Sequence, residues 1–176
     1  AIENLDEIID ASDGIMVARG DLAVETGLEG VGLLQKRIIG QSVSATKPVI
    51  TATQMMESMV DAPRPTRAEV TDVTNAVMDG TSAVMLSEET AVGKFPSEVI
   101  GFMDRICKQV EAGRLIKPRL NPLLHTRSLH RTIVSLAATA AMEQPVSAII
   151  APTASGNTAR QISAFHLPVP VIAPVT

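Results

Sequence analysis

Three short runs of β-branched and small apolar residues mark the first half of the chain. They cover residues 14–18, 48–52 and 82–86. A polar residue follows each run (Arg19, Thr53 and Ser87), and the intervals 53 − 19 and 87 − 53 are both 34 residues. That length accommodates one strand, one crossover helix and two loops. Because the runs are almost continuously apolar, they predict parallel strands that are buried on both faces.

The segments between these runs have the periodicity and the end signals of amphipathic helices. Apolar residues recur at helical spacing before residue 46, where Pro48 disfavours further helix. Thr66 and Glu69 have the spacing of a capping box, and Gly80 is placed to end the helix that follows. Pro96 suits the first turn of a third helix, which we expect to end near Gly113.

The pattern lapses after residue 113, where prolines interrupt any helix. We therefore expect a first domain over 1–115, a linker over 116–127 and a second unit over 128–176. The second unit predicts a helix with Leu129, Ile133, Leu136 and Ala140 on one face, strands at 147–151 and 169–173, and a short helix between them that ends near Phe165. The fold class is therefore α/β.

Composition excludes several classes of function. The chain has 176 residues, a net charge of −4, only 2% aromatic residues and neither Trp nor Tyr, which argues against nucleic-acid binding. A single cysteine, Cys107, excludes an internal disulfide. The sequence has neither an apolar run long enough to span a membrane nor the basic start of a signal peptide, so we expect a cytoplasmic protein without a membrane partner.

Candidate chemistry lies just after each predicted strand, where ligands bind in parallel α/β folds. Asp21 beside the backbone N–H of Gly20 could hold a hard cation together with an anionic ligand. Thr53 and Ser87 could donate or relay a proton. Helix capping is an equally good explanation of such residues, and spacing alone leaves both open.

Four motifs, over residues 15–22, 50–59, 63–69 and 84–90, resemble the last third of the catalytic barrel of pyruvate kinase, in order and with matching intervals. The Thr-Gln-Met-Met form at 53–56 is similar to the bacterial enzymes. The resemblance implies a partial (β/α)8 (TIM) barrel, namely its sixth to eighth strands, followed by part of the family's C-terminal α/β domain.

The resemblance also implies the reaction and the roles of residues. The family transfers the phosphoryl group of phosphoenolpyruvate to ADP, giving pyruvate and ATP, with Mg²⁺ (or Mn²⁺) and K⁺. Asp21 matches the metal-binding aspartate, and the N–H groups of Gly20 and Asp21 match those that bind the substrate carboxylate. Thr53 matches a threonine that contacts the substrate, and Ser87 matches a serine of the proton relay.

Regulation and assembly are implied in the same way. The loop that opens the short helix of the second unit matches the family's effector-phosphate loop, for a sugar phosphate or a nucleotide. Its candidate residues are Thr153, Ser155, Gly156, Asn157 and Thr158. Arg67 and Asp72 match a charged pair at the subunit contact of a homotetramer. The alternative is a solvated helix start.

Other parts of the family's site have no match in the sequence. These are the fifth-strand lysine and glutamate, the K⁺ site and most of the nucleotide site. We therefore expect a segment cut from a longer chain and inactive alone. A non-catalytic segment that binds a phosphorylated effector is the alternative. Glu88, where the family has Gly or Ala, adds a negative charge near the expected site.

Overall fold

The computed structural model describes residues 2–113 and 128–175. The chain divides into two compact units, one within residues 1–116 and the other within 117–176. The expected linker at 116–127 lies outside the described residues, so its position stays a prediction.

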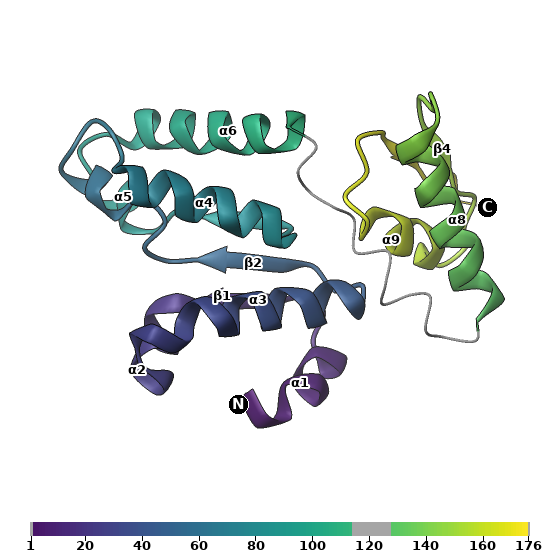
Figure 1. Cartoon of the computed structure of the whole chain (residues 1–176), viewed down its shortest axis with the longest axis horizontal. Coiled ribbons are helices and arrows are strands. Elements are labelled where there is room, and N and C mark those ends of the chain that lie inside the picture. The colour runs from purple at the N-terminus through teal and green to yellow at the C-terminus, as the bar shows by residue number, and fades with distance from the viewer. Residues whose placement is uncertain (1, 114–127, 176) are drawn as a thin grey trace. The chain divides into compact units, whose positions relative to one another are not determined.

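The first unit alternates strands and helices (Figure 1). Its strands are β1 (Ile15–Ala18), β2 (Val49–Ala52) and β3 (Ala83–Met85). Its helices are α1 (Leu5–Ala11), α2 (Arg19–Thr26), α3 (Leu28–Ser44), α4 (Arg67–Asp79), α5 (Glu88–Ala91) and α6 (Pro96–Ala112), with short 3-10 turns η1 (Ile2–Asn4) and η2 (Glu57–Val60).

The three predicted strands form one parallel sheet in the order β1-β2-β3. Ile15 lies opposite Val49 on β2, and Ile50 lies opposite Ala83 on β3. Each consecutive pair of strands is joined through at least one helix, as a parallel sheet requires. The α/β class is confirmed, and all three strands end at the same edge of the sheet.

One face of this sheet is buried within the first unit, and the other face is only partly covered. Val17 and Val49 pack with Ile38 and Ile39 of α3, and Figure 1 shows α3 alongside the sheet. By contrast Met16 is 53% exposed and its cross-strand neighbour Ile50 is 38% exposed. The prediction that the strands are buried on both faces is therefore wrong for the described residues. Helices cover one side, and nothing described covers the row that contains Met16.

The helix ends follow the predicted signals. The Thr66 hydroxyl accepts from the backbone N–H of Glu69, whose carboxylate accepts in return from the N–H of Thr66, which completes a capping box. Gly80 ends α4 with φ +94°, a left-handed conformation that favours glycine. Pro96 is the first residue of α6.

The second unit is a small βαβ arrangement. It consists of α8 (Leu129–Glu143), β4 (Ile149–Ile150), α9 (Asn157–Ser163) and β5 (Val171–Ile172), with β4 and β5 parallel. Its core contains Val134 and Ala138 of α8 together with Ile162 and Phe165. The strands are shorter than predicted, and the helix ends two residues before Phe165.

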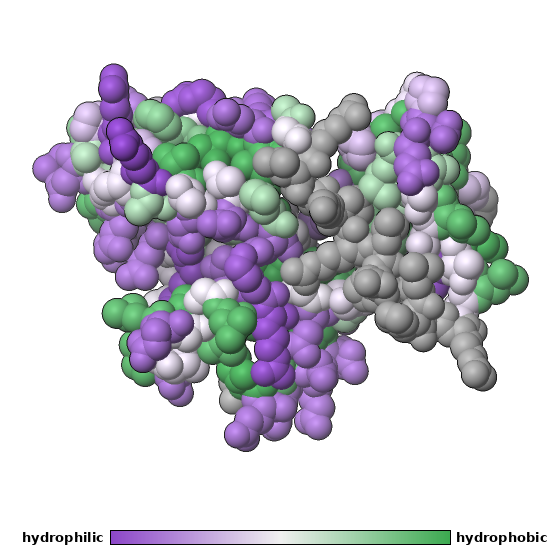
Figure 2. All heavy atoms as spheres, viewed as in Figure 1, coloured by the Kyte–Doolittle hydropathy of each residue, from purple (hydrophilic) through white to green (hydrophobic). Residues whose placement is uncertain are grey.

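The apolar face predicted for α8 is its exposed face. Leu129, Ile133 and Leu136 are between 56% and 76% exposed, whereas Val134, Ala138 and Ala141 are buried. Green surface along α8 in Figure 2 matches these exposed side chains, and more lies over α2. The helix is apolar on more than one side, so periodicity alone did not identify the buried side. Within the described ranges, no helix is both long and apolar enough to cross a membrane.

Candidate functional site

The residues after β1 begin a helix directly. Arg19 is the first residue of α2, so Gly20 and Asp21 lie in its first turn. The residue before the helix, Ala18, has no side chain that could cap it. This helix was not predicted, because it has neither a capping residue nor a linker that separates it from the strand.

The residues after β2 adopt an unusual backbone conformation. Thr53 and Gln54 both have positive φ, +68° and +52°. A β-branched residue rarely adopts this left-handed conformation. The Thr53 hydroxyl donates to the carbonyl of Ala52 (2.7 Å) and accepts from the backbone N–H of Gly20 (3.1 Å). The N–H of Gly20, expected to be free for a ligand, is therefore bound to Thr53 in this structure.

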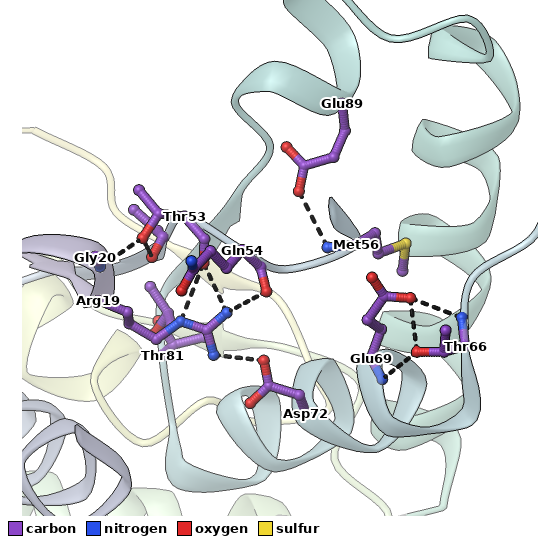
Figure 3. A network of polar contacts seen from close by, with 12 residues as sticks. Arg19, Gly20, Thr53, Gln54, Met56, Thr66, Glu69, Asp72, Thr81 and Glu89 are labelled. Carbon is purple, nitrogen blue, oxygen red and sulfur yellow. Dashed lines mark hydrogen bonds and ion pairs between the residues drawn. The ribbon is translucent and has the colours of Figure 1, made fainter. Parts of the chain in front are cut away.

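Arg19 connects the loops after β1 and β2 (Figure 3). Its side chain is buried, and its guanidinium donates to the carbonyl oxygens of Thr53 (2.7 and 3.1 Å) and Gln54 (2.8 Å). Its remaining terminal nitrogen forms an ion pair with Asp72 of α4. One planar guanidinium thus holds two consecutive left-handed residues and one carboxylate.

The partner of Asp72 bears on the expected subunit contact. Asp72 pairs with Arg19 of the same chain, whereas Arg67 is exposed and has no ion pair with any described residue. A role for Arg67 and Asp72 between subunits stays a prediction. Sequence spacing gave no sign of the pair that the structure contains, because its members are 53 residues apart.

The residues after β3 are organised by Glu89. This carboxylate is only 2% exposed. One oxygen accepts from the backbone N–H of Ser87 (2.7 Å) and the other from that of Met56 (3.0 Å), as Figure 3 shows for Met56. Sequence analysis did not single out Glu89, because its neighbour Glu88 is the same residue type. Glu88 is exposed.

Helix capping does not account for the hydroxyls of Thr53 and Ser87. Ser87 occupies the position before α5, but its side chain makes no capping hydrogen bond. The hydroxyl of Thr53 bonds to Ala52 and to Gly20 of a neighbouring strand's loop. The structure therefore leaves the Ser87 hydroxyl available for another partner.

Asp21 is the candidate metal ligand in this region. It is exposed, and its carboxylate forms no hydrogen bond or ion pair with another described residue. No group of three or more acidic, histidine or cysteine side chains that could hold a metal ion occurs in the part of the chain that the structure describes. A lone carboxylate fits Mg²⁺, which commonly combines one or two carboxylates with water and substrate oxygens.

The loop before α9 contains the candidate effector residues. Thr153 is buried and its hydroxyl accepts from the N–H of Gly156 (3.0 Å), which has φ +77°. The side-chain oxygen of Asn157 accepts from Gln161 (3.3 Å). The side chains of Ser155 and Thr158 make no hydrogen bond to other described residues. Some polar groups of the expected effector-phosphate loop thus already form hydrogen bonds within the protein.

Comparisons with known proteins match almost the whole chain. Residues 1–100 match the family model for the pyruvate kinase barrel domain, and residues 131–176 match that for the pyruvate kinase alpha/beta domain.

Relatives named pyruvate kinase include those of Sporosarcina psychrophila (49% identical) and Mycobacterium tuberculosis (47%). Each alignment covers 98% of this chain but only 30% and 36% of the relative, respectively. A pyruvate kinase crystal structure from Cryptosporidium parvum has a TM-score of 0.87 at 44% identity, over 98% of this chain and 36% of that one. The chain therefore spans about a third of the length of the proteins that it matches.

Proposed function

The chain belongs to the pyruvate kinase family, and we propose that the polypeptide containing it transfers the phosphoryl group of phosphoenolpyruvate to ADP. The observation that carries this proposal is the meeting of three loops at one edge of the sheet. The hydroxyl of Thr53 touches the backbone of Gly20, and Glu89 joins Ser87 to the loop that contains Thr53. These contacts support one site that contains the proposed substrate-carboxylate donors, the proposed metal ligand and the proposed proton relay.

The reaction assigns a separate task to each loop. Transfer breaks the bond between phosphorus and the enol oxygen and leaves an enolate, which then gains a proton at its methylene carbon to become pyruvate. Asp21 would hold Mg²⁺, which neutralises charge on the phosphoryl and enolate oxygens. Backbone N–H groups of the first turn of α2 bind the substrate carboxylate, since a helix N-terminus favours an anion.

Thr53 and Ser87 are assigned to the protonation step. Because the Thr53 hydroxyl accepts from the Gly20 N–H, a substrate carboxylate that takes this N–H would compete with Thr53 for it. Substrate binding then releases the Thr53 hydroxyl oxygen from its hydrogen bond with Gly20, beside the reacting carbon. Ser87, which has no capping role, relays the proton.

The assembly and the location are proposed from the family alone, and the effector site is proposed from the family and the loop before α9. The hydroxyls of Ser155 and Thr158, which no described residue engages, support a site for a phosphate group of a sugar phosphate or nucleotide, together with Thr153, Gly156 and Asn157. A homotetramer with Arg67 and Asp72 at the subunit contact, K⁺ as a second cofactor and a glycolytic role in the cytoplasm complete the proposal.

Asp21→Asn and Ser87→Ala test the catalytic proposal in a complete polypeptide that contains this segment. Pyruvate formation is followed by its reduction with lactate dehydrogenase and NADH. We expect Asp21→Asn to lower kcat by at least about 100-fold and to raise the Mg²⁺ concentration required. We expect Ser87→Ala to lower kcat by at least about 100-fold, the lower end of the range of general acid–base catalysis.

Asp13→Asn, the same substitution at another exposed aspartate, is the matched control and should match the wild type. Wild-type turnover in Asp21→Asn would contradict the assignment of the metal ligand. A wild-type polypeptide that binds a sugar phosphate but turns over no phosphoenolpyruvate would instead favour the non-catalytic alternative.

A further inference from the structure

The loop after the middle strand is held from both sides by buried charged side chains. Residues 53–56 follow β2, which lies between β1 and β3. Arg19 follows β1 and Glu89 follows β3, and these side chains are 6% and 2% exposed. Each reaches across to the middle loop and binds its backbone rather than its side chains.

Arg19 and Glu89 bind complementary groups of the loop. The guanidinium donates hydrogen bonds to the carbonyl oxygens of Thr53 and Gln54, which carry partial negative charge. The carboxylate accepts a hydrogen bond from the N–H of Met56, which carries partial positive charge. Both interactions are charge-assisted hydrogen bonds, which are roughly twice as strong as neutral ones.

The loop conformation requires such restraint. Thr53 and Gln54 are both left-handed, and non-glycine residues hold this conformation only when their surroundings impose it. Met55 and Met56 are fully buried and anchor the other end of the loop. Arg19 holds the end of the loop that carries the Thr53 hydroxyl, and this hydroxyl accepts from the N–H of Gly20.

Glu89 also ties the loop to the residue proposed as the proton relay. Its second oxygen accepts from the N–H of Ser87, so one carboxylate fixes the backbones of Ser87 and Met56 together. Figure 3 shows Arg19 and Glu89 approaching this loop from different elements. Among the described side chains, Glu89 makes no ion pair, so its hydrogen-bonding capacity serves these two backbone groups.

We propose that Arg19 and Glu89 are positioning residues that set the relative placement of Thr53 and Ser87 for the proton step. This inference rests on the proposed function. Neither side chain would touch the substrate. Their effect would pass through the loop backbone, and a displacement of about 1 Å at a reacting group lowers a rate by about 100-fold.

The test uses a complete polypeptide containing this segment, with Glu89→Gln, Arg19→Lys and the double variant. Exchange of the methyl hydrogens of pyruvate for deuterium in D₂O, followed by proton NMR, reports the proton step alone. We expect Glu89→Gln and Arg19→Lys each to slow this exchange by about 10- to 100-fold, while the KM for ADP changes by less than about twofold. Because both residues act on one loop, the double variant should lose less than the product of the two single losses.

Glu57→Gln and Arg105→Lys are the matched controls, because both residues are exposed and Glu57 adjoins the same loop. They should exchange at the wild-type rate. All rates are compared per folded protein, measured by circular dichroism, and Arg19→Lys decides the matter if Glu89→Gln does not fold. Variants that exchange within twofold of an active wild type would overturn the inference, as would equal losses in exchange and ADP affinity. A wild type that neither exchanges nor transfers would overturn the proposed function instead.

Discussion

At the scale of single residues, Glu88 and Glu89 differ completely in surroundings although they are adjacent and identical in type. Glu89 is buried and accepts two backbone N–H groups, whereas Glu88 begins α5 and is exposed. Neighbouring side chains leave a helix in different directions, and this is enough to give the two glutamates different surroundings. We therefore expect mutations of Glu89 to act through the backbone groups that it binds. Mutations of Glu88 should act only through the loss of its charge.

Replacing Glu88 with alanine should lower the KM for phosphoenolpyruvate in the complete polypeptide. Removing an exposed negative charge near an anionic substrate lowers the electrostatic repulsion between them. The KM should fall by up to about fivefold, since exposed charges typically interact by less than about 1 kcal/mol. The effect should shrink as salt is added. Glu98→Ala, at another exposed glutamate, serves as the control. An unchanged KM would place Glu88 outside the site.

Cys107 should react slowly with thiol reagents. It is half-buried on α6, and burial raises its pKa, with Glu111 and Asp104 raising it further. A raised pKa leaves less thiolate at any given pH, and the thiolate is the reacting form. We expect iodoacetamide to label Cys107 at about pH 8 several-fold more slowly than free cysteine, measured by mass spectrometry. Labelling as fast as free cysteine would contradict the burial.

Residue types alone predicted candidates for this site, and their roles stay predictions. Asp21, Thr53 and Ser87 were found because each follows an apolar run closely. Arg19 and Glu89 could not be assigned, because their partners on the loop after β2 lie 34 and 33 residues away and are backbone groups, which every residue has. The positive φ of Thr53 is equally invisible, since threonine is a poor candidate for it.

At the scale of elements, the start of α4 is stabilised by more than its capping box. The Glu69 carboxylate accepts from the N–H and hydroxyl of Ser58 as well as from Thr66. Burial of Glu69 acts to raise its pKa, but the hydrogen bonds from Ser58 and Thr66 outweigh burial, so the pKa lies below its ordinary value of 4.5. The helix is thus joined to the preceding 3-10 turn η2 through Ser58.

The contribution of Glu69 to stability should depend on pH. A carboxyl whose pKa is lower in the folded state stabilises fully above its unfolded pKa, and this stabilisation disappears as pH falls through the folded pKa. We expect Glu69→Gln to destabilise the protein at about pH 7 but progressively less towards about pH 3, in urea unfolding at each pH. Glu98→Gln, an exposed first-turn glutamate of α6, is the control. A penalty that is constant with pH would contradict this assignment.

Local signals and packing were predicted with different success. The capping box of α4, Gly80 and Pro96 are signals carried by neighbouring residues, and all three act as predicted. The buried side of α8 did not follow from the pattern, because Leu129 and Val134 are both apolar and only the surroundings decide which one is covered. The ends of a helix depend on residues that are close in sequence, whereas the burial of a side chain depends on how the elements pack together.

At the scale of the whole molecule, we expect the isolated 176-residue chain to be catalytically inactive. The resemblance places the lysine that stabilises the transferring phosphoryl group on an earlier strand, and this sequence contains no match to it. The test is the coupled assay with phosphoenolpyruvate, ADP and Mg²⁺, with the complete polypeptide at equal concentration as the positive control. Measurable turnover by the isolated chain would show that the lysine is dispensable or present.

The strand order has a consequence for how the sheet assembles during synthesis. Each pairing joins residues separated by nearly the same chain length, 49 − 15 = 34 for β1 with β2 and 83 − 50 = 33 for β2 with β3. β2 and β3 therefore each find a neighbour in the stretch of chain that left the ribosome just before them. The sheet grows in one direction as translation proceeds, and each newly added strand needs only the closure of one loop of moderate length.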